Sequence, residues 1–160
     1  MKSEPEVYPF TKLVSDGRTT WDGVRNPQAR SYLAAMSPGD FVLFYHSHDA
    51  EVVGIARVTK SAFPDPTSPD PRWLAVELEA VRPLEAPVTL ERIKGDRAFA
   101  ELKLVKQSRL SVMPVEPAHY ERILALAKTP GARSASTPRA AAPSRSRAAR
   151  AGSRKRPPRA

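Results

Sequence analysis

The sequence predicts one α+β domain over residues 1–128, followed by a basic tail over residues 129–160. Short apolar runs typical of strands alternate with short amphipathic segments that begin at capping residues. Residues 1–128 carry 17 basic and 17 acidic side chains and are therefore neutral. The tail carries eight arginines, one lysine and no acid, so the whole net charge of +9 belongs to it.

The tail contains no Val, Ile, Leu, Met or aromatic residue. It cannot bury enough apolar surface to offset the entropy of ordering, so we expect it to be disordered. Its arginines would attract phosphate in a salt-dependent way, without aromatic rings to stack on bases. A solubilising appendage with no specific partner is the alternative.

The composition excludes several classes of protein. The chain has no cysteine, which excludes disulfides, thiolate metal sites and a cysteine nucleophile. No apolar run approaches the ~20 residues that a membrane span needs, and the first residues do not resemble a signal peptide. We therefore expect no membrane association and a cytoplasmic location, with the nucleoid as the site in a bacterium.

The first part of the chain predicts a short helix and then a rigid loop. The helix is expected within residues 7–14, before a turn at Gly17. Further on, Asn26 followed by Pro27 is typical of an N-cap and the first position of a helix. The loop before this helix carries Trp21 and would suit recognition of a ligand. An ordinary core role for Trp21 is the alternative, since buried aromatic residues are common.

The middle of the chain predicts three strands. Residues 41–45 are a continuous apolar run, which indicates a strand buried on both faces. Residues 51–59 form the returning strand, in which Gly54 permits a close backbone approach. Residues 73–81 alternate between apolar and acidic side chains, as in a half-buried strand. Four prolines within residues 62–72 predict a loop between the last two strands.

The last part of the domain predicts short helices and one more strand. Thr89 and Asp96 are each expected to cap a short helix. The apolar run at residues 110–115 predicts a last strand, and Pro117 opens a final helix with one apolar stripe.

No sequence motif points to a metal or a cofactor. A phosphate-binding glycine loop, a nucleophile elbow and a zinc-protease helix are all missing from the sequence. His46 and His48 would share one face of a strand and would need Asp49 or His119 as a third ligand. Two histidines without cysteine are a weak signal, so hydrogen-bonding or exposed roles are favoured.

Two acidic residues offer a possible acid–base pair. Glu4 and Asp22 would serve this chemistry only if they met in space, and the sequence gives no reason that they do. Turn and cap roles are therefore favoured for both residues.

Eight short motifs occur in an order that resembles the EVE domain family. They are Lys2–Pro5, Trp21–Asn26, Phe44–Ser47, Val53–Ala56, Phe63–Thr67, Arg72–Trp73, Pro87–Leu90 and Gln107–Val115. The resemblance covers about residues 1–128. It implies a PUA-like fold, which is a small, mostly antiparallel β-barrel with helices packed around it. It also implies a non-catalytic binding module that reads modified bases, most often modified cytosine in DNA.

The resemblance further implies partners and a pocket. RNA is a possible ligand besides modified DNA, and bacterial members occur beside restriction-type defence proteins. The family pocket corresponds to Lys2, Ser3, Trp21, Val24, Arg25, Asn26, Tyr45, His46, Ser47, Arg109, Leu110, Ser111 and Val112. One of the two aromatic rings would stack on a flipped base, and an aliphatic side chain of this set would receive a 5-methyl group. The amide and hydroxyl groups would contact the base edge, and the cations would hold phosphate or a polar edge.

The sequence departs from the family pattern at three places. The family's opening strand usually begins several residues before Lys2, so we expect the true start to lie upstream of Met1. A shortened first strand, which would expose an edge of the barrel, is the alternative. The loop at residues 62–72 is short, and Ser108 stands where glycine is frequent.

Two other functions remain open from the sequence. One is an enzyme acting on a base or nucleotide, with Glu4 or Asp22 as its acid or base. The other is a protein-interaction module whose tail anchors it to nucleic acid.

Overall fold

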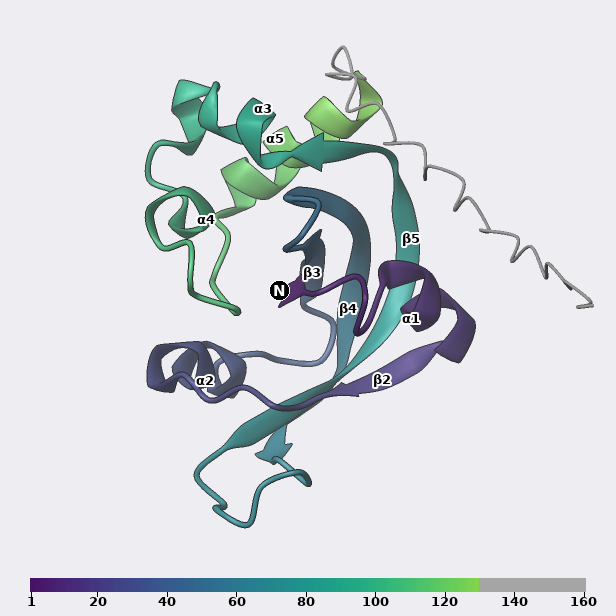
Figure 1. Cartoon of the computed structure of the whole chain (residues 1–160), viewed down its shortest axis with the longest axis vertical. Coiled ribbons are helices and arrows are strands. Elements are labelled where there is room, and N and C mark those ends of the chain that lie inside the picture. Colours follow the sequence, from purple (N-terminus) through teal and green to yellow (C-terminus); the bar gives the residue numbers. More distant parts are fainter. Residues whose placement is uncertain (130–160) are drawn as a thin grey trace, which may run out of the picture.

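The computed structural model describes residues 1–129 and confirms an α+β fold (Figure 1). In chain order the elements are β1 (Lys2–Ser3), α1 (Phe10–Asp16), β2 (Arg18–Trp21), α2 (Pro27–Ala34), β3 (Phe41–His46), β4 (Glu51–Pro64), β5 (Leu74–Thr89), α3 (Leu90–Lys94), a 3-10 turn (Arg97–Phe99), α4 (Lys103–Lys106) and α5 (Pro117–Lys128). The predicted disorder of the tail lies outside the described residues.

The strands form one strongly curved sheet in the order β1-β3-β4-β5-β2. The short β1 pairs in parallel with β3, and every other pair is antiparallel. Several register shifts interrupt the pairing of the long strands β4 and β5. Such bulges bend a strand and increase its twist, so the sheet curls into an open barrel (Figure 1). A mostly antiparallel barrel-like sheet with packed helices is the predicted architecture.

Helices α2 to α5 gather at two ends of this sheet, whereas α1 lies beside β5 (Figure 1). Figure 1 shows α3, α4 and α5 together at one end and α2 at the other, with the N-terminus between them. The predicted caps are confirmed, because the side chains of Asn26, Thr89 and Asp96 each accept a hydrogen bond from a backbone N–H of the following turn. No helix within residues 1–129 has the length and apolar character needed to cross a membrane.

The prolines led to strands that were predicted too short. β4 continues to Pro64, and β5 continues past Pro83 to Thr89. Pro64 is the last residue of its strand, and Pro83 lies opposite Gly54 beside a register shift. Proline is tolerated at strand ends and bulges because no ladder hydrogen bond is lost there. The predicted loop at residues 62–72 therefore begins too early.

The strand predicted at residues 110–115 is wrong, because residues 107–116 form neither strand nor helix. Leu110 and Val112 are both buried in the core, and the residues on either side of them are more accessible. This alternation resembles that of a strand, but the segment pairs with no strand as part of the sheet. The backbone of this segment meets the sheet where Lys2 N–H donates to the Ser111 carbonyl at 2.9 Å. Conversely, β2 was missed, since its polar sequence has no apolar alternation.

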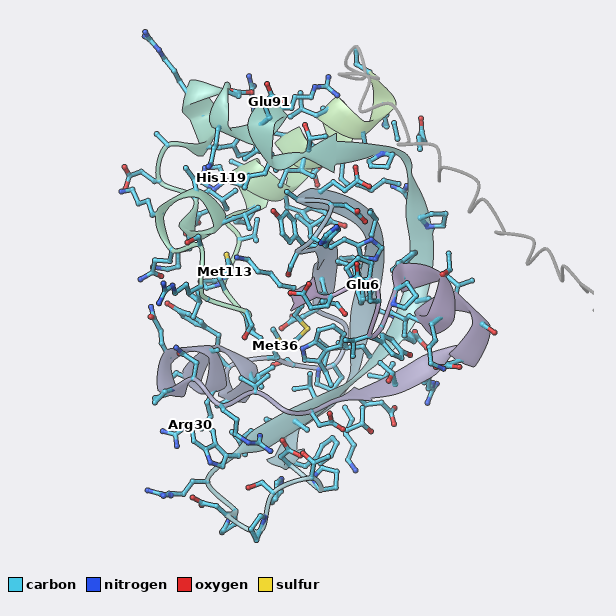
Figure 2. All side chains as sticks on the ribbon, in the orientation of Figure 1. Glu6, Arg30, Met36, Glu91, Met113 and His119 are labelled. Carbon is cyan, nitrogen blue, oxygen red and sulfur yellow. The ribbon has the colours of Figure 1, made fainter. Side chains whose placement is uncertain are left out.

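β3 separates two hydrophobic cores, as its apolar sequence predicted. Val42 and Phe44 pack in the core that is shared with α1 and α2, whereas Leu43 and Tyr45 pack in the core beneath the C-terminal helices. Phe41 departs from this pattern, because it is 58% exposed. Figure 2 shows Met113 between these two regions, where it contacts both cores.

Gly54 confirms the predicted close approach. A Cβ atom at this position would lie less than 3 Å from several atoms of the Phe10 ring. The Phe10 ring of α1 is therefore packed directly on the backbone of β4 at Gly54.

Candidate functional site

The loop between β2 and α2 forms most of a recess of about 380 Å³, which we call the first recess. It is lined by Lys2, Trp21, Asp22, Gly23, Val24, Arg25, Asn26, Pro27 and Ser111. The loop is fixed at both ends. Gly23 turns the chain with a φ of +73°, a conformation that favours glycine, and the Ala29 N–H donates to Asn26 Oδ1 at 3.0 Å. The recess therefore has a preformed wall.

A buried carboxylate holds this wall from behind. Asp65 Oδ2 accepts a hydrogen bond from Gly23 N–H at 2.9 Å and another from Arg25 Nη1 at 2.6 Å. Asp65 Oδ1 accepts from the N–H and the hydroxyl of Thr67 at 2.7 and 2.6 Å. Arg25 Nη2 completes the cluster by donating to Thr67 Oγ1 at 3.1 Å.

These contacts decide the charge of Asp65. Its side chain is fully buried, and burial alone would raise the pKa of the carboxyl group. The hydrogen bonds from Thr67, Arg25 and Gly23 outweigh burial and hold the pKa well below its usual range. Asp65 is thus an ionised buried group whose oxygens are satisfied by the loop that it supports.

Asp65 was absent from the predicted site, although it lies in the motif Phe63–Thr67. The available signal was the Asp-x-Thr spacing, which is typical of an Asx turn whose carboxylate binds nearby backbone groups. Its distant partners could not be read from the sequence, because Gly23 and Arg25 precede it by about forty residues.

Trp21 contacts the core and also lines the first recess. Its ring forms a T-shaped pair with Phe44, with the ring centroids 5.5 Å apart, and another with Tyr8, with the centroids 6.5 Å apart. The side chain is only partly buried. The core role considered for Trp21 is therefore confirmed, and the same core contacts fix the ring at the wall of the first recess.

A second recess of about 510 Å³ lies beside the first. It is lined by Lys2, Glu4, Tyr45, Ser47, Ala50, Leu90, Leu104, Ser108, Arg109 and Ser111. Lys2 and Ser111 line both recesses, and their backbones are joined by the hydrogen bond described above. The Lys2 ammonium group donates to the Ser108 carbonyl and lies 5.7 Å from the centroid of the Tyr45 ring. Burial lowers the pKa of Lys2 and raises that of Tyr45.

The structure brings most of the predicted pocket residues to the two recesses. Those of the first recess are Lys2, Trp21, Val24, Arg25, Asn26 and Ser111, and the second recess adds Tyr45, Ser47 and Arg109. Four others lie elsewhere. Leu110 and Val112 are buried in the core, and the Ser3 hydroxyl donates to the Tyr8 carbonyl at 2.7 Å. His46 Nε2 accepts from Phe10 N–H at 3.1 Å.

Within residues 1–129 the structure does not bring the histidines together as a metal cluster, nor Glu4 and Asp22 together as a pair. His46 Nδ1 lies 3.5 Å from Asp49, whereas His48 faces Glu6 at 3.9 Å. Within residues 1–129 no three metal-ligating side chains come together. Glu4 lines the second recess and Asp22 lines the first, so the structure does not pair these two carboxylates in one recess.

A curved, mostly antiparallel sheet with packed helices and a recess beside its first strand defines a small domain of the PUA-like class. The chain belongs to the EVE domain family, whose model matches residues 1–126. The predicted family is thus confirmed. The match ends within α5, two residues before that helix ends at Lys128.

Several known proteins are similar over most of the domain. Mouse thymocyte nuclear protein 1 is 32% identical over an alignment of 164 positions. The alignment covers 81% of this chain and 73% of the mouse protein. The structure of Rpa0253 from Rhodopseudomonas palustris is 37% identical with a TM-score of 0.77, covering 80% of this chain and 90% of that one. Human thymocyte nuclear protein 1 has been solved in complex with DNA that contains 5-methylcytosine. It is 30% identical with a TM-score of 0.74 and covers 82% of this chain and 97% of its own.

Proposed function

We propose that this protein is a non-catalytic reader of modified bases, with modified cytosine in DNA as its ligand. The observation that carries the proposal is the first recess, which combines an aromatic ring, an aliphatic side chain and fixed polar groups. The similarity to a human protein that binds DNA containing 5-methylcytosine supports the same ligand class.

The first recess suits a base that has left the duplex. A reader must flip the base or take it from a single strand before it can contact all of its edges. The ring of Trp21 offers an apolar surface for stacking. Val24 is buried in the core with 6% of its surface exposed, and it is the aliphatic side chain of the lining that a 5-methyl group would meet. Asp22 supplies an acceptor for the N4 amino group of cytosine, a pairing that carboxylates make with this base.

The distribution of charge suggests different roles for residues 1–128 and residues 129–160. Residues 1–128 are neutral, so the recess would discriminate by shape and hydrogen bonds. The nine cationic side chains of residues 129–160 would add affinity for phosphate that is independent of sequence. RNA as a ligand and defence proteins as partners belong to the same proposal, on the family resemblance alone.

The separation of Glu4 and Asp22 argues against an acid–base pair. A mechanism that used both carboxylates on one substrate group would need them in the same recess, and they line different recesses. Turnover of a nucleotide that depends on either carboxylate would overturn this part of the proposal.

Binding to matched oligonucleotides tests the function directly. Fluorescence polarisation would compare otherwise identical strands that contain cytosine, 5-methylcytosine or 5-hydroxymethylcytosine, as DNA and as RNA. We expect residues 1–128 to prefer one modified strand by at least about tenfold. Equal binding of all strands by this fragment would contradict a modified-cytosine reader, while full-length protein would still bind through its tail.

A further inference from the structure

Apart from Lys2 and Ser111, the second recess is lined by different side chains from the first. At about 510 Å³ it is the larger of the two, and it falls within the range of small-molecule sites. The family resemblance treats the residues of both recesses as one pocket. In this chain, however, the backbone hydrogen bond between Lys2 and Ser111 lies in the wall that the two recesses share.

The lining of the second recess combines an apolar part with polar groups. Leu90, Leu104 and the ring of Tyr45 supply apolar surface. Arg109 is exposed and forms no ion pair with any residue of the described part of the chain, so its guanidinium is free to meet a phosphate. Glu4 adds an acceptor, which suits the amino group of a base.

Ala50 provides independent evidence that this wall is specified. It has a φ of +52°, a left-handed conformation that disfavours any residue with a Cβ. Its carbonyl accepts a hydrogen bond from Leu90 N–H at 2.7 Å, which ties the turn after β3 to the start of α3. Residues held in such strained conformations cluster at functional sites. Glycine would adopt this conformation without strain, but the chain has alanine here, and Ala50 lines the second recess.

We propose that the second recess binds the nucleotide adjacent to the modified one, so that the protein reads a two-nucleotide step. This inference rests on the proposed function. A base in the first recess has its neighbour on the same strand within one backbone unit, and the shared wall of Lys2 and Ser111 separates the recesses by a single pair of residues. The neighbouring base contacts the apolar surface, while Arg109 holds a phosphate.

Calorimetric titration of small ligands tests the second site. The probes are 5-methyl-2′-deoxycytidine monophosphate, its unmethylated counterpart, and dinucleotides with 5-methylcytosine on either side of each ordinary base. We expect at least one dinucleotide to bind about tenfold more tightly than the methylated mononucleotide. Dinucleotides that all bind like the mononucleotide would overturn the proposal.

A pair of variants tests whether the higher affinity for a dinucleotide comes from the second recess. Leu90→Trp fills the second recess from a partly buried position, so it should remove the tenfold gain and leave the mononucleotide affinity unchanged. Glu91→Trp is the control, because it adds the same ring at the next residue, which is exposed and lies outside both recesses (Figure 2). If Leu90→Trp weakened both ligands equally or weakened neither, the second site would be disproved.

Arg109→Ala gives a second test that does not touch the core. It should reduce the dinucleotide gain by about threefold to tenfold, and an unchanged gain would contradict a phosphate contact. The failure of the proposed function has a different signature. In that case the methylated and unmethylated mononucleotides bind equally, whether or not a dinucleotide binds more tightly.

Discussion

Arg25 donates from Nη1 to the buried Oδ2 of Asp65 at 2.6 Å, across forty residues of sequence. This contact joins the loop that lines the first recess to the connection between β4 and β5. Arg25 also lies with its guanidinium carbon 5.7 Å from the centroid of the Trp73 ring, at the far end of the same connection. The first recess is thus held by a second loop that does not itself line it.

Asp65→Asn should destabilise the domain and weaken base discrimination. The amide keeps the shape of the carboxylate but loses the charge that pairs with Arg25, and its NH₂ group lacks a matched acceptor. Loss of a hydrogen bond to a buried charged group costs on the order of 1–3 kcal/mol. Urea unfolding would measure this loss. Asp70→Asn is the control, since Asp70 pairs with exposed Arg72 on the surface and should change stability little.

Acid should remove the stabilisation that Asp65 provides. Its pKa in the folded protein lies below that of the unfolded chain, which is about 4. The stabilisation is therefore complete above about pH 4 and is lost as the pH falls from there toward the folded pKa. Urea unfolding of the wild type and Asp65→Asn between pH 7 and pH 2 should show their stabilities converging at the acidic end. A constant difference over that range would contradict this assignment.

Trp21→Ala should abolish selectivity for a modified base while leaving salt-sensitive binding by the tail. Stacking on an aromatic ring contributes about 1–3 kcal/mol, so the domain should lose roughly fivefold to 150-fold in affinity. Fluorescence polarisation at two salt concentrations would separate the two effects. Because Trp21 also packs on Phe44, thermal unfolding must be measured alongside. If Trp21→Leu restores stability and selectivity together, the ring serves the core and not the ligand.

Gly54→Ala should destabilise the domain without touching either recess. The new Cβ would overlap the Phe10 ring, which is itself buried in the core. Overpacking of this kind costs about 1–3 kcal/mol. Gly95→Ala is a matched control, because the nearest atom to its Cβ would be a backbone oxygen at an ordinary 3.5 Å. Equal stability of the two variants in urea would show that the Phe10 ring moves aside freely.

Deletion of residues 129–160 should lower the affinity for all DNA and reduce its salt dependence. Each phosphate contact that is lost lowers the slope of log K against log salt by about 0.9. The preference for a modified base should persist in residues 1–128. Loss of all nucleic-acid binding with the tail would instead favour the protein-interaction module.

Local sequence determined the starts of α2, α3 and the 3-10 turn because their capping signals are local. The side chains of Asn26, Thr89 and Asp96 cap the turns that immediately follow them, and such caps depend on residues three or fewer positions apart. The apolar run of β3 likewise indicated burial on both faces. Prolines misled the strand boundaries, because a bulge that tolerates Pro83 forms only when the partner strand is in place.

The sequence by itself determined the family, the charges of the neutral domain and its basic tail, and nine of the seventeen residues that line the recesses. Motif order and charge are properties of the chain, so no coordinates were needed for them. The tertiary structure decided how those residues are divided. It buried Leu110 and Val112, turned His46 toward Phe10, and placed Asp65 behind the first recess. These outcomes depend on contacts between segments far apart in sequence, and only the curvature of the sheet brings such segments together.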